Sequence, residues 1–128
     1  MMRTYYIFKI NKYFSYVYKN KPYKIYEQIA IPFIKGELNK YLYELYNDNI
    51  CYLTNKNTHI YSSNFEYSKL VITNSNLKIK TSVNYPIFLN DINNYFDNIF
   101  VCDFINKDYF WLDKIIKKDR QSEKYEVK

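Results

Sequence analysis

The chain of 128 residues carries a formal net charge of +6, and 48% of its residues are hydrophobic. No apolar run reaches the length of a transmembrane helix, and the N-terminus lacks the order of a signal peptide, which argues against a membrane or exported protein. We therefore expect a cytoplasmic protein whose Cys51 and Cys102 are reduced. The length suits a single domain over residues 1–116, followed by a charged tail at residues 117–128.

The first predicted strand covers residues 4–10, which are β-branched or aromatic except for one lysine. Asn11 follows as a helix N-cap, and the spacing then becomes helical. Phe14 and Tyr18 are four residues apart and share one helix face, whereas Tyr13 lies on another. Either both aromatic faces are buried in the core or one is left to bind a partner, and spacing alone does not decide between them.

The next predicted elements are helical. Residues 23–30 have the spacing of a short helix between two prolines, and residues 37–49 form the clearest amphipathic helix of the chain. Residues 54–66 are polar and rich in turn-forming types, so we interpret them as a loop with room for one short strand. His59 lies in this loop and is expected to be solvated.

The second half of the chain alternates between strands and one helix. Residues 67–73 and 77–83 form a predicted hairpin, and the second of these runs has one face in water. A helix is predicted after Pro86, and residues 99–104 and 109–112 have the composition of strands. Together these elements predict an α+β fold, a single domain with a mixed sheet of about four to six strands and helices packed on it.

Few residues are suited to catalysis or metal binding. The chain has one histidine and one glycine, and its two cysteines stand far apart, so it lacks the spacing of metal sites and the glycine-rich loops that hold phosphates. Asp103, at the end of a buried strand, is expected to bond the turn that follows. We therefore expect neither an enzyme nor a bound cofactor or metal.

Two motifs carry a resemblance to a known family. They are Tyr5-Tyr6-x-x-x-Ile10 followed by Phe14-x-x-x-Tyr18, and Cys102-Asp103-Phe104-x-x-x-x-Tyr109-x-Trp111-Leu112. In this order and spacing they resemble the sporulation inhibitor of replication family (SirA) of spore-forming Firmicutes. After Leu112 the chain reads Asp-Lys, where that family tends to have Asn-Pro.

The resemblance implies an α/β domain that binds domain I of the replication initiator DnaA and stops new rounds of replication on entry into sporulation. It implies that Phe14 and Tyr18 form the contact surface. Asn49 and Tyr52 stand where the family has a Gln and a Tyr as a second contact patch, so Asn49 departs from the pattern but keeps an amide. We expect a monomer in contact with this protein partner.

Two alternatives remain open. A small basic domain can bind nucleic acid through stacked tyrosines and through lysines such as Lys78 and Lys80 on the water-exposed strand face. Because the lysines are scattered and usually have acidic residues nearby, we expect direct nucleic-acid binding less than protein binding. The other alternative is a SirA-like fold that binds a different protein.

Overall fold

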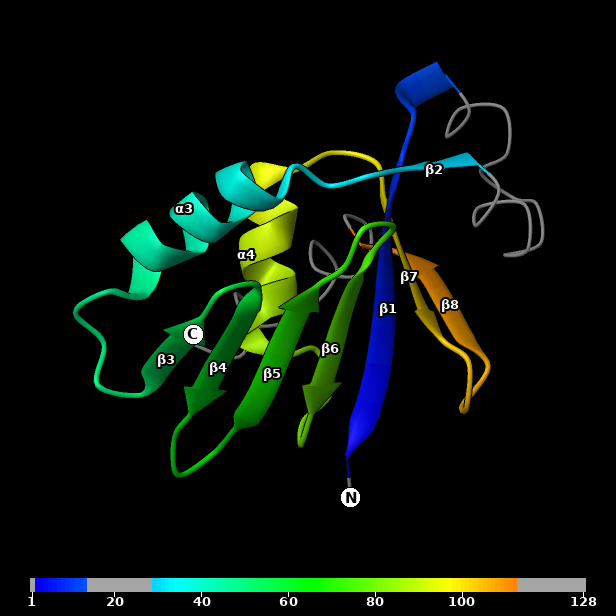
Figure 1. Ribbon diagram of the computed structural model, residues 1–128. Coiled ribbons are helices and arrows are strands. Elements are labelled where there is room, and N and C mark those ends of the chain that lie inside the picture. Colours follow the sequence, from blue (N-terminus) through cyan, green and yellow to red (C-terminus); the bar gives the residue numbers. More distant parts are fainter. Residues whose placement is uncertain (1, 14–28, 113–128) are drawn as a thin grey trace, which may run out of the picture.

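The computed structural model describes residues 2–13 and 29–112 of the chain (Figure 1). Its centre is an eight-stranded sheet in the order β3-β4-β5-β6-β1-β7-β8, with the short β2 paired to β1. All pairings given for these strands are antiparallel. The elements in chain order are β1 (Arg3–Ile10), β2 (Ala30–Ile31), α3 (Lys35–Tyr46), β3 (Tyr52–Asn55), β4 (Thr58–Ser62), β5 (Tyr67–Ile72), β6 (Leu77–Thr81), α4 (Ile87–Tyr95), β7 (Ile99–Asp103) and β8 (Asp108–Trp111).

The side chains of β1 alternate between the two faces of the sheet, as the pleat of a strand requires. Tyr5 and Ile7 point into the larger core, which they share with α3, α4 and the other strands. α4 lies behind β5 in Figure 1, so this core fills the space between the sheet and the helices α3 and α4. Phe8 and Ile10 belong to a second cluster on the opposite face, together with residues of β7 and β8.

The predicted fold class is wrong, because the structure is mostly β. The sheet has eight antiparallel strands in place of a mixed sheet of four to six, and the described residues contain only two short helices, α3 and α4. The polar stretch 54–66, predicted as a loop with room for one short strand, supplies both the end of β3 and all of β4. A turn in which Lys56 has a φ of 55° joins the two strands. β3 is an edge strand whose side chains are mostly exposed, so its sequence shows no apolar alternation.

A second difference concerns the segment before α3. Ala30 was expected to end a helix over 23–30, but Ala30–Ile31 is a strand that pairs with Lys9 and Ile10 of β1. Only residues 29 and 30 of that predicted helix lie within the described part of the chain. A strand as short as β2 draws its stability from pairing with β1, which the local spacing does not reveal.

The remaining predicted elements inside the described residues are confirmed within a few positions. They are the first strand, the amphipathic helix, the hairpin at 67–83, the helix after Pro86 and the two final strands. Asn11 accepts a hydrogen bond from the backbone N–H of Tyr13 (2.9 Å), as an N-cap does. Both cysteines are free.

Asp103 fastens the end of the sheet, as predicted. Its carboxylate accepts hydrogen bonds from the backbone N–H of Asn106 (3.2 Å) and from the Asn106 side chain (2.7 Å). It also pairs with the Arg3 guanidinium at 2.9 Å, which ties β1 to the turn between β7 and β8. Burial acts to raise the pKa of Asp103, but the bonds from Asn106 and Arg3 outweigh it and lower that pKa.

Candidate binding surfaces

Two of the four predicted contact residues lie in the described part of the chain. Phe14 and Tyr18 fall outside it, so their role stays a prediction. Asn49 lies in the link between α3 and β3, and Tyr52 is the first residue of β3. The structure therefore places Asn49 and Tyr52 at the start of an edge strand of the sheet.

Asn49 shapes an exposed turn. Its side-chain oxygen accepts a hydrogen bond from the backbone N–H of Cys51 (2.8 Å), and its own N–H donates to the carbonyl of Tyr46 (2.9 Å). The next side chain, Ile50, is 99% exposed, and Leu53 is 69% exposed. Isolated exposed aliphatic residues are ordinary, but two within five residues of a predicted contact position indicate a surface that a partner could cover.

Tyr52 points the other way, into the protein. Its side chain is only 8% exposed, and its ring stacks on that of Tyr46 with the centroids 5.2 Å apart. The exposed side chains next to Asn49 are thus Ile50 and Leu53, which the sequence analysis did not single out. The sequence contains no local signal that Ile50 is exposed, because it begins the apolar run Ile-Cys-Tyr-Leu at residues 50–53.

His59 is buried and bonded, so the expectation of a solvated loop histidine is wrong. Its Nδ1 lies 2.6 Å from the Tyr52 hydroxyl and its Nε2 lies 2.7 Å from the side-chain oxygen of Asn39. Burial lowers the pKa of His59 to about 4, because a charged imidazolium would lose its hydration there. His59 is therefore neutral at physiological pH and links β4 to β3 and α3.

A second buried polar contact joins the two helices. The Tyr46 hydroxyl of α3 donates a hydrogen bond to the Asp91 carboxylate of α4, and the Tyr41 hydroxyl donates to the Asp91 backbone carbonyl at 2.8 Å. Burial raises the pKa of Asp91 to about 6, since the ionised carboxylate is poorly solvated. These contacts fix α3, and with it the turn at Asn49.

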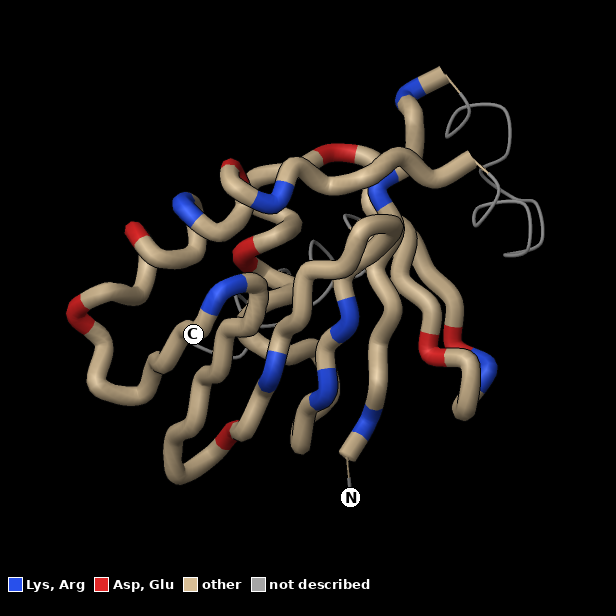
Figure 2. The backbone as a smooth tube through the Cα atoms, viewed as in Figure 1, with Lys and Arg blue, Asp and Glu red and all other residues tan. Residues whose placement is uncertain are grey.

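The face of the sheet that points away from α3 and α4 carries three lysines, here named the lysine face (Figure 2). They are Lys69 on β5 and Lys78 and Lys80 on β6. The alternation of β6 buries Leu77, Ile79 and Thr81 and turns both of its lysines to the other side. Lys69 stands directly opposite Lys80 across the β5–β6 pair. None of these lysines is in the ion pairs found among the described residues.

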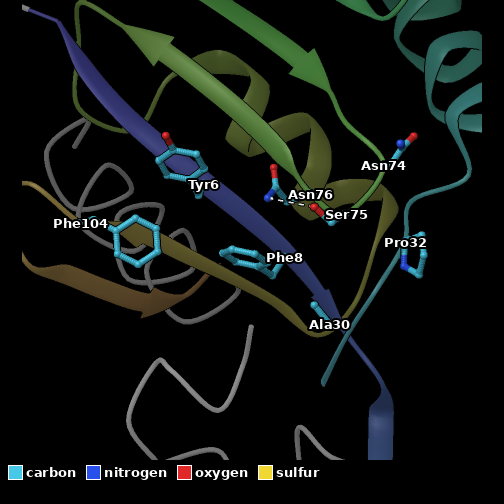
Figure 3. A pocket seen from close by; sticks show the side chains of 8 residues that line it. All are labelled: Tyr6, Phe8, Ala30, Pro32, Asn74, Ser75, Asn76 and Phe104. Atoms are coloured by element: carbon cyan, nitrogen blue, oxygen red, sulfur yellow. Dashed lines mark hydrogen bonds between the residues drawn. The ribbon is translucent and has the colours of Figure 1, made fainter. Parts of the chain in front are cut away.

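Beside the lysine face lies a hollow of about 430 Å³, here named the aromatic hollow. Its described lining is aromatic on one side and polar on the other, as Figure 3 shows: Tyr6, Phe8, Ala30, Pro32, Asn74, Ser75, Asn76 and Phe104. The rings of Tyr6 and Phe104 are 5.4 Å apart, and the Lys78 ammonium lies 5.7 Å from the centre of the Tyr6 ring. The hollow and the lysine face are thus continuous.

Over residues 2–13 and 29–112 no helix is long and apolar enough to cross a membrane, and no three His, Cys, Asp or Glu side chains are grouped to hold a metal ion. No protein-family model matches the chain, and no curated protein matches it at a significant level. The likeness to the SirA family therefore rests on the two motifs quoted for it.

Proposed function

We propose that this protein inhibits the initiation of chromosome replication by binding domain I of DnaA during entry into sporulation. The observation that carries the proposal is the pair of SirA-like motifs, with Phe14 and Tyr18 at the spacing of that family's contact helix. The protein acts as a monomer in the cytoplasm. Inhibition is steric, because the bound protein occupies a surface of domain I that other initiation factors need.

The turn at Asn49 supports a second contact patch. Its Ile50 and Leu53 side chains are already in water, so a partner that covers them gains about 1.5–3 kcal/mol for each side chain it buries fully. Tyr52 acts there by holding the turn through its ring contact with Tyr46 and its hydroxyl contact with His59. Phe14 and Tyr18 are the candidate hot spots, where truncation typically weakens binding by about 2 kcal/mol or more.

The test is calorimetry of the purified chain with DnaA domain I from the same organism. We expect binding in the wild type, loss of binding in Phe14→Ala, and weaker binding in Ile50→Ser. The matched control is Ile105→Ser, since Ile105 is an 84% exposed isoleucine in the turn between β7 and β8, at the opposite end of the strand order from β3.

Circular dichroism must show that each variant is folded. A folded wild type that does not bind domain I removes DnaA as the partner and leaves the alternative of a different protein. Equal weakening by Ile50→Ser and Ile105→Ser would show that exposed aliphatic residues bind without preference for the turn at Asn49.

A further inference from the structure

We infer that the lysine face, together with the aromatic hollow, binds single-stranded nucleic acid. This activity differs from the proposed binding of DnaA in its ligand. It uses strands β5, β6 and β1 on the face of the sheet opposite α3 and α4, whereas Asn49 and Tyr52 lie at the start of β3. Three observations support it: the arrangement of the lysines, the absence of acidic residues from the strands around them, and the aromatic lining next to them.

The lysines stand where they repel each other. Lys69 and Lys80 are cross-strand neighbours, and like charges directly opposite in an antiparallel pair destabilise it. No Asp or Glu occurs in any of the five adjacent strands β3, β4, β5, β6 and β1, so no strand residue offsets this repulsion. An anionic ligand lying along β5 and β6 removes the repulsion, and a chain of phosphates can contact all three lysines at once.

The aromatic hollow distinguishes a nucleic acid from other polyanions. Lys78 lies over the ring of Tyr6, and Tyr6 in turn packs beside Phe104 in the hollow wall. Nucleobases stack on such rings, and the amide side chain of Asn74 on the other wall can hydrogen-bond the edge of an unpaired base. The Asn76 amide already bonds Thr73 and Ser75 and shapes that wall. An acidic protein segment matches the lysines but leaves the aromatic rings of the hollow without a role.

The shape of the site favours a single strand over a duplex. A sheet surface with aromatic rings contacts bases only when they are unpaired and splayed out. The hollow, of about 430 Å³, lies at the end of the lysine face near the turn between β5 and β6. A strand that follows the lysines can therefore place one base in the hollow.

The test is fluorescence anisotropy of the full chain with a labelled oligothymidylate at two salt concentrations. We expect wild-type binding that weakens steeply with salt. The variant Lys69→Gln/Lys80→Gln should bind more weakly, and the slope of log affinity against log salt should become shallower by about 1.4, which is about 0.7 for each phosphate contact removed from a single strand. Its matched control is Lys35→Gln/Lys40→Gln, which removes the same charge from α3.

Tyr6→Leu tests the aromatic hollow. It should weaken binding at least about fivefold and leave the salt slope unchanged, because stacking involves no counterion release. Phe104→Leu, at the ring that packs beside Tyr6 in the hollow, gives a second aromatic variant if Tyr6→Leu is not folded.

Three outcomes overturn the inference. The first is a folded wild type that does not bind the oligonucleotide at low salt. The second is equal weakening of binding by the two double lysine variants, which would mean that affinity depends on the net charge of the protein and not on the lysine face. The third is displacement by polyglutamate combined with wild-type affinity in the folded aromatic variant, which would identify an acidic protein as the ligand.

Discussion

The buried His59 and Asp91 should have opposite effects on the pH dependence of stability. The pKa of His59 is lowered from 6.5 to about 4 in the folded protein, and that of Asp91 is raised from 3.8 to about 6. Between pH 4 and 6 the folded protein holds one proton, on Asp91, and the unfolded chain also holds one, on His59. The numbers of bound protons are equal, so this pair leaves the free energy of unfolding nearly constant in that window.

Each substitution exposes the effect of the other group. In Asp91→Asn only His59 remains, and its stabilising contribution is complete above pH 6.5 and is lost as the pH falls toward 4, by about 3 kcal/mol in total. In His59→Gln only Asp91 remains. Its raised pKa gives stability that is present below pH 3.8 and is lost as the pH rises through 6, again by about 3 kcal/mol.

The assay is urea unfolding of the wild type and both variants at half-unit steps from pH 4 to 7. The wild-type value at each pH is subtracted, which removes the contribution of all other titrating groups. We expect the two difference curves to have opposite slopes of about 1.4 kcal/mol per pH unit between pH 4 and 6. Difference curves with the same slope would refute the opposite pKa shifts of His59 and Asp91.

An independent measurement does not need the variants. His59 is the only histidine of the chain, so without an affinity tag the Hε1 proton of its ring gives a single histidine Hε1 resonance to follow by NMR. We expect that resonance to stay in its neutral position down to about pH 5, since the pKa is about 4. A midpoint near 6.5 would mean that the imidazole is solvated.

Three further predictions concern stability, each read from denaturant unfolding. Asp103→Asn removes the ion pair with Arg3 and should destabilise the fold by about 2 kcal/mol at pH 7; because the pKa of Asp103 is lowered, its contribution is present above pH 3.8 and the difference from wild type should shrink as the pH falls below it. Leu42→Ala empties a fully buried position and should destabilise by about 3 kcal/mol, whereas an equal effect of Leu45→Ala, at a half-exposed residue, would argue against the described core. Tyr46→Phe leaves the Asp91 carboxylate without its donor and should destabilise by about 1–2 kcal/mol, with no change expected if that bond is absent.

The strongly patterned segments could be predicted from the sequence, and the strands held by their neighbours could not. The stripe of residues 37–49 and the alternation of residues 77–83 each reflect one buried face, so α3 and β6 were found. β3 and β4 carry mostly polar side chains, and three of the four residues of the edge strand β3 are exposed, so neither strand shows the apolar alternation from which a strand is predicted. The prediction of the fold class was wrong for this reason.

The same distinction applies to the candidate binding surfaces. Features that follow from the alternation of one strand could be predicted, and features that depend on how two elements meet could not. The lysine face follows from the alternation of Lys78 and Lys80, whereas its Lys69 partner depends on the β5–β6 register. His59 appeared solvated because its neighbours in sequence are polar, yet Asn39 reaches it from α3 and shields it. The exposure of Ile50 and the burial of Tyr52 likewise depend on how α3 meets the edge of the sheet.

The place of β1 in the sheet has a consequence for synthesis of the chain. β1 is translated before the other strands, but residue 6 pairs with residues 78 and 102 on its two sides. At about 5–20 residues per second, the ribosome needs about 4–14 s after residue 6 to reach residue 78 and about 5–19 s to reach residue 102. The aromatic strand therefore lacks both long-range partners until β6 is made, and it lacks β7 for longer. Folding of the sheet must therefore wait until β7 has emerged, so we expect slow folding and transient protection of the nascent β1 by chaperones.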